Sequence, residues 1–437
     1  MRNTSQSFAT YAAATTGAPT NDSASGPTPV DSPASALPVQ TAALLEQVRH
    51  QLSSGQPEWK NRTDAETHIP VERYFAPEVW QAELQALFKP LPLIAAHSSE
   101  IGLGQALAHD DFGVPLLLTR DADGVLRCFL NVCRHRGMRL LESSDCAQTR
   151  NSVVCPYHGW TYKLDGGLRH MLHADAFDAC PKAQRDLMPV PCEERHGLVW
   201  VVPDPNGKLD LDAYLGGLNG ELPFLAIDKL QHFRTIQTEY PANWKLIIDA
   251  FLESYHIRVL HQKTIYPFFA DGVTSAQPFG QHIHSLVARR AAQDWATAPD
   301  SKMPDTVEAL SQLVTTSQVI FPNTVTIFHP DYLSLISVVP TGPETLRWTH
   351  RMLIPANKTT PDWTPHWEKT FQLIEQGVFQ KEDIHCAIGI QRGFKSGANA
   401  YVTAGRAEQG LTWFHDHVAR ATEPFLDKSN IASNPSI

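Results

Sequence analysis

Two short stretches decide how this chain is interpreted: Cys133-Arg-His135-Arg-Gly137 and Cys155-Pro-Tyr-His158-Gly159-Trp160. Each stretch offers one thiolate and one imidazole, and each is a near copy of the other. This arrangement suits a [2Fe–2S] cluster in which the two cysteines hold one iron and the two histidines hold the other. Neutral imidazoles reduce the negative charge of such a cluster and raise its reduction potential, so it would accept electrons from a flavin or ferredoxin donor.

A structural zinc ion and simple packing are the alternatives for these four side chains. Zinc modules usually pair like ligands, two cysteines followed by two histidines, whereas each pair here is mixed. The spacing therefore favours the iron–sulfur cluster. Gly137 and Gly159 suit tight loops whose backbone N–H groups point at the cluster sulfurs. Cys128 and Cys146 lie nearby without a matching histidine, and we expect both to be buried thiols.

A second set of metal-binding side chains lies between residues 243 and 261, in Asn-Trp-Lys-Leu-Ile-Ile-Asp-Ala-Phe-Leu-Glu-Ser-Tyr-His-Ile-Arg-Val-Leu-His. On a helix, His256 would share a face with Glu253, three residues earlier. His261 would be rotated off that face unless the helix breaks near Val259-Leu260, and we predict that break. Two histidines on an apolar helix are more often core or surface residues than ligands. The upstream Cys/His loops reverse that expectation.

An iron that activates O2 usually has two histidines and one carboxylate on one face of the metal. The best source of the carboxylate is the acidic pair Glu382-Asp383, although such a pair on a helix is ordinarily a solvated face. His385 beside the pair is expected in a second shell or at the surface. Asp249, one turn before Glu253, is a further catalytic candidate near the iron, and a plain helix-face role is equally open.

Composition excludes several classes of protein. The chain has 437 residues, which is long for one core, and carries 36 Lys+Arg against 46 Asp+Glu, a formal charge of −10. No basic run would follow a phosphate backbone, so nucleic acid is not expected as a partner. No apolar stretch of membrane-spanning length and no export signal is apparent, which predicts a soluble cytoplasmic protein without membrane contact. Seven cysteines, an odd number, favour metal ligation over a disulfide framework.

Local composition and apolar spacing along the chain predict an α+β protein with four parts. Residues 1–40 are a low-complexity, disordered tail, and residues 41–90 carry helices that pack on the catalytic domain. Residues 91–203 show short apolar runs and turns, which indicate an all-β module. Residues 204–437 mix helices with β-rich segments and predict an antiparallel sheet with flanking helices. The expected helices and strands of this last part are 243–260, 363–394, 319–328, 332–339 and 346–354.

The two Cys/His stretches resemble the Rieske signature, Cys-x-His-Arg-Gly followed by Cys-x2-His-Gly-Trp. From about residue 75 onwards, the order of motifs resembles the α subunit of Rieske non-haem iron aromatic ring-hydroxylating oxygenases. The resemblance implies a Rieske domain at residues 91–203 and a helix-grip-like catalytic domain. It also implies that Cys133, His135, Cys155 and His158 are the ligands of the [2Fe–2S] cluster.

The segment between residues 243 and 261 resembles the catalytic motif of the same family, Asn-Trp-Lys leading to an acid and then x2-His-x4-His. By position, His256 and His261 would bind Fe(II). Glu253 would be the acid that bridges this iron to the cluster of a neighbouring subunit, a place where many relatives have Asp. The acidic pair, followed by a glutamine eight residues later, puts Asp383 at the position of the third ligand and leaves Glu382 as the alternative.

This resemblance implies a terminal oxygenase component that hydroxylates or oxidatively demethylates a small organic substrate with O2. Electrons would come from NAD(P)H through a separate reductase or ferredoxin. The substrate would be an aromatic acid or a methylated ammonium compound, and the Glu at residue 253 favours a monooxygenase made of α subunits only. A head-to-tail homotrimer is implied, with or without a small β subunit. The alternatives are a Rieske electron-transfer protein without oxygenase activity and a zinc-stabilised interaction module.

Three weaker signals complete the sequence. Ile101-Gly102-Leu103-Gly104 imitates a dinucleotide loop but lacks its third glycine and its βα context, so the nicotinamide site belongs to the reductase. His282 and His284 alternate along a strand and would line a pocket or, as we favour, point at solvent. Phe328 and residues 333–339 are expected to form part of the pocket wall.

Overall fold

The longest strands of the chain lie in one antiparallel sheet that begins at Leu230. The computed structural model describes residues 37–63, 65–142, 147–177 and 182–426, and within them this sheet has seven strands. Every residue of its two strands between 314 and 328 is buried, so these strands are continuous apolar and Ser/Thr runs, as a sheet covered on both faces requires. In spatial order the strands are β13 (Leu230–Tyr240), β19 (Thr345–Pro355), β18 (Leu333–Gly342), β17 (Thr324–Phe328), β16 (Val314–Ile320), β15 (His282–Arg289) and β14 (Phe269–Phe279).

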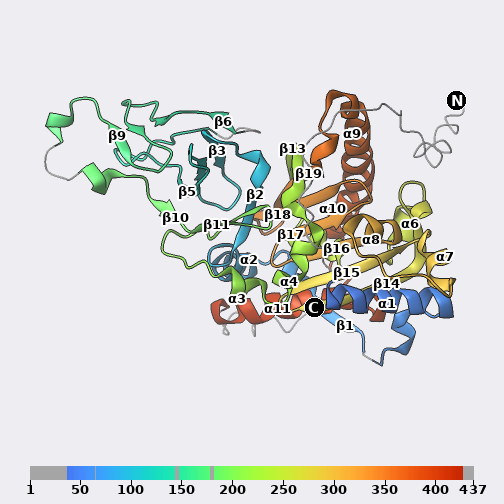
Figure 1. Ribbon diagram of the computed structural model, residues 1–437. Helices are drawn as coiled ribbons and strands as arrows, with labels where there is room; N and C mark the ends of the chain where they lie inside the picture. Colours follow the sequence, from blue (N-terminus) through green and yellow to red (C-terminus); the bar gives the residue numbers. More distant parts are fainter. Residues whose placement is uncertain (1–36, 64, 143–146, 178–181, 427–437) are drawn as a thin grey trace, which may run out of the picture. The chain divides into compact units, whose positions relative to one another are not determined.

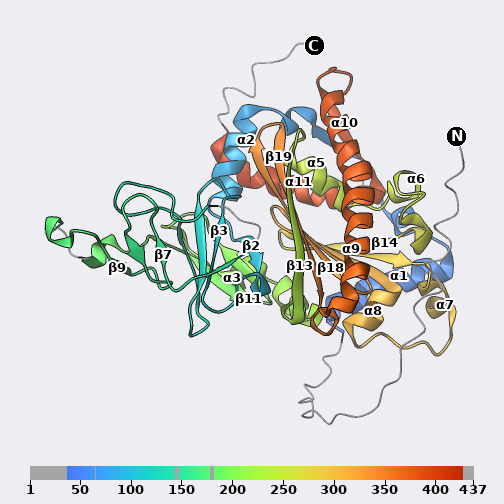
Figure 2. The same ribbon diagram turned by 90° about the horizontal axis from the view of Figure 1, so that it is seen from above.

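Helices cover this sheet and carry the acidic and histidine motifs. Three of them form one continuous column in Figure 2, in which a π-helical segment (η12) lies between two α-helices. The Asn243 side chain caps the first helix of the catalytic motif by accepting from Lys245 N (3.0 Å), and Gln391 accepts from Asn243 N (2.8 Å). The column is therefore tied to the start of that helix. The elements are α5 (Trp244–Phe251), α6 (Ile257–Leu260), α9 (Thr364–Phe371), η12 (Gln372–Asp383), α10 (Ile384–Phe394) and α11 (Gln409–Thr422).

The two Cys/His stretches lie in a module of three small antiparallel sheets. The module shares a core with the rest of the chain, because the largest apolar cluster joins Leu116 and Cys128 of the module to Ile336 and Trp348. The strands of the three sheets, in spatial order, are β10 (Pro189–Val190), β5 (Leu126–Leu130), β4 (Leu116–Arg120), β3 (Gln105–His109) and β6 (Gln148–Thr149); β11 (Cys192–Arg195), β12 (Leu198–Val201) and β2 (Leu93–His97); and β7 (Val153–Val154), β8 (Thr161–Tyr162) and β9 (Leu168–His170).

The remaining elements frame the main sheet. In Figure 1, α1 lies beside β14 and β15, where Thr41 donates to Glu221 Oε2 and Gln51 donates to Thr274 O (2.9 Å). Residues 1–36 of the expected tail fall outside the described residues, and the helix begins at Val39, two residues before the expected boundary. The elements are α1 (Val39–Ser54), β1 (Thr67–Pro70), α2 (Pro77–Glu83), α3 (Leu211–Leu215), α4 (Leu218–Glu221), α7 (Ala292–Thr297), α8 (Val307–Leu313) and β20 (Tyr401–Ala404).

The predicted α+β class is confirmed, and so are the two helices expected before the β module, found as α1 and α2. The β-rich segment 319–328 was expected as one unit. It contains the end of β16 and the whole of β17, because the chain turns at Phe321–Asn323.

The favoured interpretation of His282 and His284 is wrong, because both side chains are 1% exposed and satisfied inside the core. His282 Nε2 donates to Tyr214 O (2.8 Å), and Gln318 Nε2 donates to His284 Nδ1 (3.1 Å). Burial lowers the pKa of His282 and of His284 to about 4, so both rings are neutral. Phe328 is likewise buried, in an apolar cluster beside α1.

In the part of the chain that the structure describes, no helix has the length and apolar character needed to cross a membrane.

A buried ion pair anchors α5 to α2. The Lys245 ammonium donates to Glu83 Oε1 (2.5 Å), Trp244 Nε1 donates to Glu83 Oε2 (2.8 Å), and the Lys245 and Glu83 side chains are 0% exposed. Burial lowers the pKa of Lys245, and the adjacent Glu83 carboxylate opposes that shift. Each charge therefore depends on the other to remain in the core.

We expect Lys245→Met to reduce the free energy of unfolding by about 3–5 kcal/mol, because it leaves the Glu83 carboxylate buried without its counter-charge. The double variant Glu83→Leu/Lys245→Met removes both charges and should recover most of the loss. Urea unfolding followed by tryptophan fluorescence measures both changes. A single variant as stable as the double variant would contradict the pairing argument.

Candidate metal centres

A turn, not a continuous helix, brings Glu253 to His256. The sequence predicted one helix with both residues on one face, but α5 ends at Phe251 and the next helix begins at Ile257. The Glu253 carboxylate accepts from the backbone N–H groups of Tyr255 and His256 (3.2 Å for His256), and such local bonds compete with helix formation. The predicted break after Val259 is confirmed, because α6 ends at Leu260.

Side chains from two distant segments converge at one point. One ligand atom each from His256, His261 and Asp383 lies within 4.8 Å of the others. Asp383 Oδ1 is 3.1 Å from His261 Nε2 and 3.7 Å from His256 Nε2. Asp383 and His261 are buried at 7% and 2% exposure. Two histidines and one carboxylate in this arrangement form the ligand set that suits non-haem Fe(II).

The hydrogen bonds around both histidines leave unpaired lone pairs directed at one point, where a cation could bind. His261 Nδ1 donates to Glu382 Oε2 (2.7 Å), and His256 Nδ1 donates to Glu253 Oε1. A proton held on Nδ1 leaves the lone pair of Nε2 free, so both rings aim a lone pair towards Asp383. Asp383 Oδ1 is itself buried without a hydrogen-bond partner. A bound cation satisfies all three atoms, and the residues therefore fit a metal.

Glu382 and Asp383 lie next to different nitrogen atoms of the His261 ring. Glu382 lies on the Nδ1 side of His261, where it also accepts from Thr264 Oγ1 (2.8 Å), and Asp383 lies on the Nε2 side. Burial lowers the pKa of His261, but the adjacent carboxylates of Asp383 and Glu382 outweigh burial and raise it overall. A proton therefore competes with a metal for this ring.

The two Cys/His loops are equivalent in structure. Cys133 N donates to Met138 O and Cys155 N donates to Trp160 O, both at 2.8 Å. Gly137 and Gly159 have φ values of 80° and 70°, the left-handed conformation that favours glycine. Their N–H groups donate to the carbonyls of the two cysteines at 3.0 and 3.1 Å. The two glycine N–H groups therefore close the loops, and in the first loop the backbone N–H of His135 hydrogen-bonds the Cys133 sulfur, as expected of loop N–H groups.

The four candidate cluster ligands converge as two like pairs. The Nδ1 atoms of His135 and His158 are 3.1 Å apart, and both rings are partly exposed. Cys133 and Cys155 are both 2% exposed. Burial raises the pKa of the Cys133 thiol, and the Tyr162 hydroxyl at 3.5 Å from its sulfur opposes that shift. Buried thiolates need the positive charge of iron, so this donor set fits a cluster with its histidine side towards solvent.

Aromatic rings hold the two histidines in place. Trp160 stacks on His135, with ring centroids 4.9 Å apart and an angle of 10° between the planes. Tyr157 lies against His158 with a centroid distance of 3.7 Å. Both histidine rings therefore have an aromatic neighbour that restricts their rotation.

Comparison with known proteins agrees with both centres. A family model of the Rieske [2Fe-2S] domain matches residues 92–182, and a model of the ring hydroxylating alpha subunit catalytic domain matches residues 227–423. The chain belongs to the Rieske non-haem iron oxygenases. It is the oxygenase component of such a system, with a [2Fe–2S] cluster and an Fe(II) centre, and takes its electrons from a reductase. This membership replaces the two alternative interpretations, the pure electron carrier and the zinc module.

Individual relatives act on different substrates. The carnitine monooxygenase oxygenase subunit of Acinetobacter pittii is 28% identical over 374 residues, which cover 80% of this chain and 94% of the relative. The chlorobenzene dioxygenase subunit alpha of Cupriavidus sp. is 27% identical over 59% of this chain and 66% of the relative. A crystal structure of a quaternary ammonium Rieske monooxygenase with L-carnitine has a TM-score of 0.69 and 25% identity, and the match covers 83% of this chain and 97% of that one.

One acid and one histidine near the motifs in the sequence lie outside the group of three converging side chains, and the histidine occupies one of its two expected positions, the surface. Asp249 accepts from Tyr74 OH (2.7 Å) and lies 2.8 Å from His415 Nε2, in a buried group below α5. It is not a member of the metal-binding group. His385 is exposed on α10.

Neither Tyr162 nor Thr264 could be identified from the sequence, because a single hydroxyl is recognised as part of a site only when the fold brings it to a sulfur or a carboxylate. Two of the cysteines, Cys146 and Cys180, fall outside the described residues, and Cys128 is buried as expected.

We expect Tyr162→Phe to lower the reduction potential of the Rieske cluster by about 40 mV. The lost hydrogen bond to Cys133 is worth about 1 kcal/mol, and 59 mV corresponds to about 1.4 kcal/mol for one electron. A potentiometric titration monitored by paramagnetic resonance measures the shift. Tyr157→Phe is the control, because the Tyr157 hydroxyl contacts Arg136 and not a sulfur. A Tyr162→Phe cluster with the wild-type potential would contradict the assignment.

Proposed function

We propose that this chain is the oxygenase component of a monooxygenase that oxidises a small methylated ammonium compound, with His256, His261 and Asp383 as the ligands of its Fe(II). The observation that carries the proposal is the convergence of three ligand atoms within 4.8 Å, beside a buried Asp383 oxygen that lacks a hydrogen-bond partner. Fe(II) in such a site supplies O2 activation, because three protein ligands leave coordination positions open.

The chain's own residues prepare this centre. Glu253 and Glu382 hold the Nδ1 protons of the two histidines and so direct both Nε2 atoms at one point. Such partners orient the ligand rings and raise their basicity. Asp383 is the third ligand, and Glu382, which occupies the far side of His261, is not.

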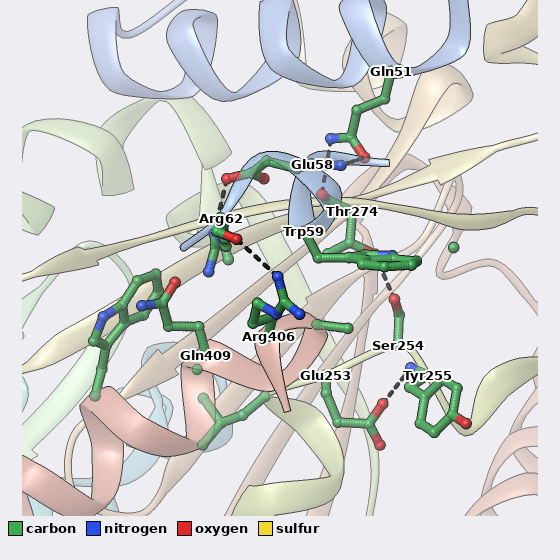
Figure 3. A pocket seen from close by; sticks show the side chains of 16 residues that line it. Gln51, Glu58, Trp59, Arg62, Glu253, Ser254, Tyr255, Thr274, Arg406 and Gln409 are labelled. Carbon is green, nitrogen blue, oxygen red and sulfur yellow. Dashed lines mark hydrogen bonds and ion pairs between the residues drawn. The ribbon is translucent and has the colours of Figure 1, made fainter. Parts of the chain in front are cut away.

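Electrons reach Glu253 from outside the subunit, in a head-to-tail homotrimer that needs no β subunit. Glu253 lines a surface pocket with Trp59 and Arg406, and in Figure 3 its carboxylate lies beside Tyr255 at one end of that pocket. Tyr255 is 76% exposed, and Val259 on the following helix is 80% exposed. Apolar side chains this exposed around a bridging acid suit a surface that another protein chain covers. The cluster loops of a second copy are the occupant, because their histidines are partly exposed.

A cationic substrate is supported by charge and by the relatives. The carnitine monooxygenase subunit aligns over 94% of its length, whereas chlorobenzene dioxygenase aligns over 66% and the anthranilate 1,2-dioxygenase of Acinetobacter baylyi over 43%. The formal charge of −10 attracts cations and repels aromatic carboxylates at long range. A methylated ammonium compound therefore fits better than an aromatic acid.

With a surrogate reductase, we expect kcat/KM for carnitine, γ-butyrobetaine or glycine betaine to exceed that for anthranilate or chlorobenzene by at least roughly tenfold. Substrate-dependent O2 uptake and mass spectrometry of the products measure the preference. Asp383→Ala is the control and should retain the cluster spectrum while losing turnover. Faster turnover of the aromatic compounds would contradict the substrate assignment.

Complementation tests the route between subunits. Cys155→Ser, which removes the cluster, and Asp383→Ala, which removes the iron, should each give inactive trimers. Co-expressed in equal amounts, they should recover about a quarter of the wild-type activity per subunit, because one in four head-to-tail contacts then joins an intact cluster to an intact iron site. Mixed trimers without activity would contradict transfer between subunits.

A further inference from the structure

The helix that carries Asp383 has an unusual register. η12 (Gln372–Asp383) is π-helical over 12 residues and ends at Asp383. π-helices are rare, usually occupy a single turn and are frequent at functional sites. A π-helix has more residues per turn than an α-helix, so consecutive side chains diverge by a smaller angle. This register lets the consecutive residues Glu382 and Asp383 reach opposite sides of one ring, that of His261.

A buried carboxylate lies in the first turn of the π-helix. Glu375 is 0% exposed, and its Oε1 accepts from Gln380 Nε2 (3.0 Å). A separation of five residues matches the i→i+5 repeat of a π-helix, whereas in an α-helix these two positions point in different directions. The Glu375–Gln380 bond is therefore compatible with only one of the two registers.

The same carboxylate is tied to the sheet. His350 on β19 donates from Nδ1 to Glu375 Oε2 (2.8 Å), and His350 Nε2 lies 3.0 Å from Ser334 Oγ on β18. His350 is 1% exposed and Ser334 is 0% exposed. Phe371 stacks on the His350 ring with a centroid distance of 5.4 Å and an angle of 6° between the planes. The ring cannot turn without breaking both bonds and this stack.

Stability alone does not explain this polar chain. Replacing a buried ion pair by apolar residues of similar size often leaves a protein equally or more stable. In the best-attested cases, buried polar groups determine which of two alternative helix registers a protein adopts. η12 must be π-helical, not α-helical, if Asp383 at its end is to lie at the metal site.

We propose that Ser334, His350, Glu375 and Gln380 are positioning residues that lock η12 in its π-helical register and thereby place Glu382 and Asp383 around His261. This inference rests on the ligand set given under the proposed function. The four residues touch neither metal nor substrate in this role. They act through the helix, and loss of the lock releases the register rather than unfolding the domain.

The test separates register from stability with the double variant His350→Phe/Glu375→Leu. It replaces the polar pair by apolar residues and keeps an aromatic ring against Phe371. The matched control is Thr41→Val/Glu221→Leu, which removes another buried polar pair, far from η12 in the sequence. Three quantities are measured on protein with an intact cluster: the Fe(II) dissociation constant, the urea midpoint, and hydrogen exchange of the amides of residues 372–383.

We expect His350→Phe/Glu375→Leu to weaken Fe(II) binding by about tenfold or more and to speed exchange across residues 372–383. Its urea midpoint should stay at or above that of the wild type, and the control should bind Fe(II) as the wild type does. Wild-type Fe(II) affinity in the test variant would overturn the lock, as would an equal loss in the control. Asp383→Ala is measured in parallel. If it loses Fe(II) while the lock variant does not, only the lock fails; if it binds Fe(II) normally, the proposed ligand set fails as well.

Discussion

The candidate iron site depends on one interaction that both of its histidines make, the hydrogen bond from Nδ1 to a carboxylate. Glu253 makes it with His256, and Glu382 makes it with His261. Each bond fixes a tautomer and aims the other ring nitrogen at the Asp383 oxygen. Three electron pairs then meet in a buried space, which is unfavourable without a cation. The orientation of the two histidines therefore favours the binding of a metal ion.

Much of the surrounding fold can be understood as support for that arrangement. α5 and α10 carry the two halves of the site, and the contact between Asn243 and Gln391 joins them. The Lys245–Glu83 pair joins α5 to α2. The iron site therefore draws on residues more than 120 positions apart, whereas each cluster loop is closed by bonds within six residues of its cysteine. The cluster is a local structure and the iron site is a tertiary one.

This difference explains what the sequence could and could not predict. The spacing of Cys133, His135, Cys155 and His158 predicted two similar loops because local loops preserve spacing, and the helix and strand classes followed from apolar periodicity. The turn at Glu253 was not predictable, since its carboxylate competes with the helix for backbone N–H groups and apolar periodicity does not record that competition. The register of η12 was equally hidden, because apolar spacing at α-helical period continues through it.

Sequence spacing alone did not fully distinguish candidate site residues from buried structural ones. Asp249 and Glu253 are both acids in the segment 243–261 and are four residues apart. Asp249 contacts Tyr74 and His415 because α5 is still helical at this position. His282 and His284 looked like candidates for a surface or a pocket, but Tyr214 on α3 is a partner of His282, and Gln318 on β16 and Thr41 on α1 are partners of His284. Which face of a strand is buried depends on the order of strands in the sheet, and the chain does not state that order locally.

The two centres also differ in how they meet solvent, and this bears on how electrons move. The cluster loops bury their thiols and leave His135 and His158 partly exposed, while the iron site buries His261 and Asp383. Glu253 lines a pocket at the surface and yet bonds directly to His256. A single carboxylate thus spans from the protein surface to a ligand of the buried site. In the route proposed above, this hydrogen bond is the one step that links the surface pocket to His256, because His261 and Asp383 are both buried.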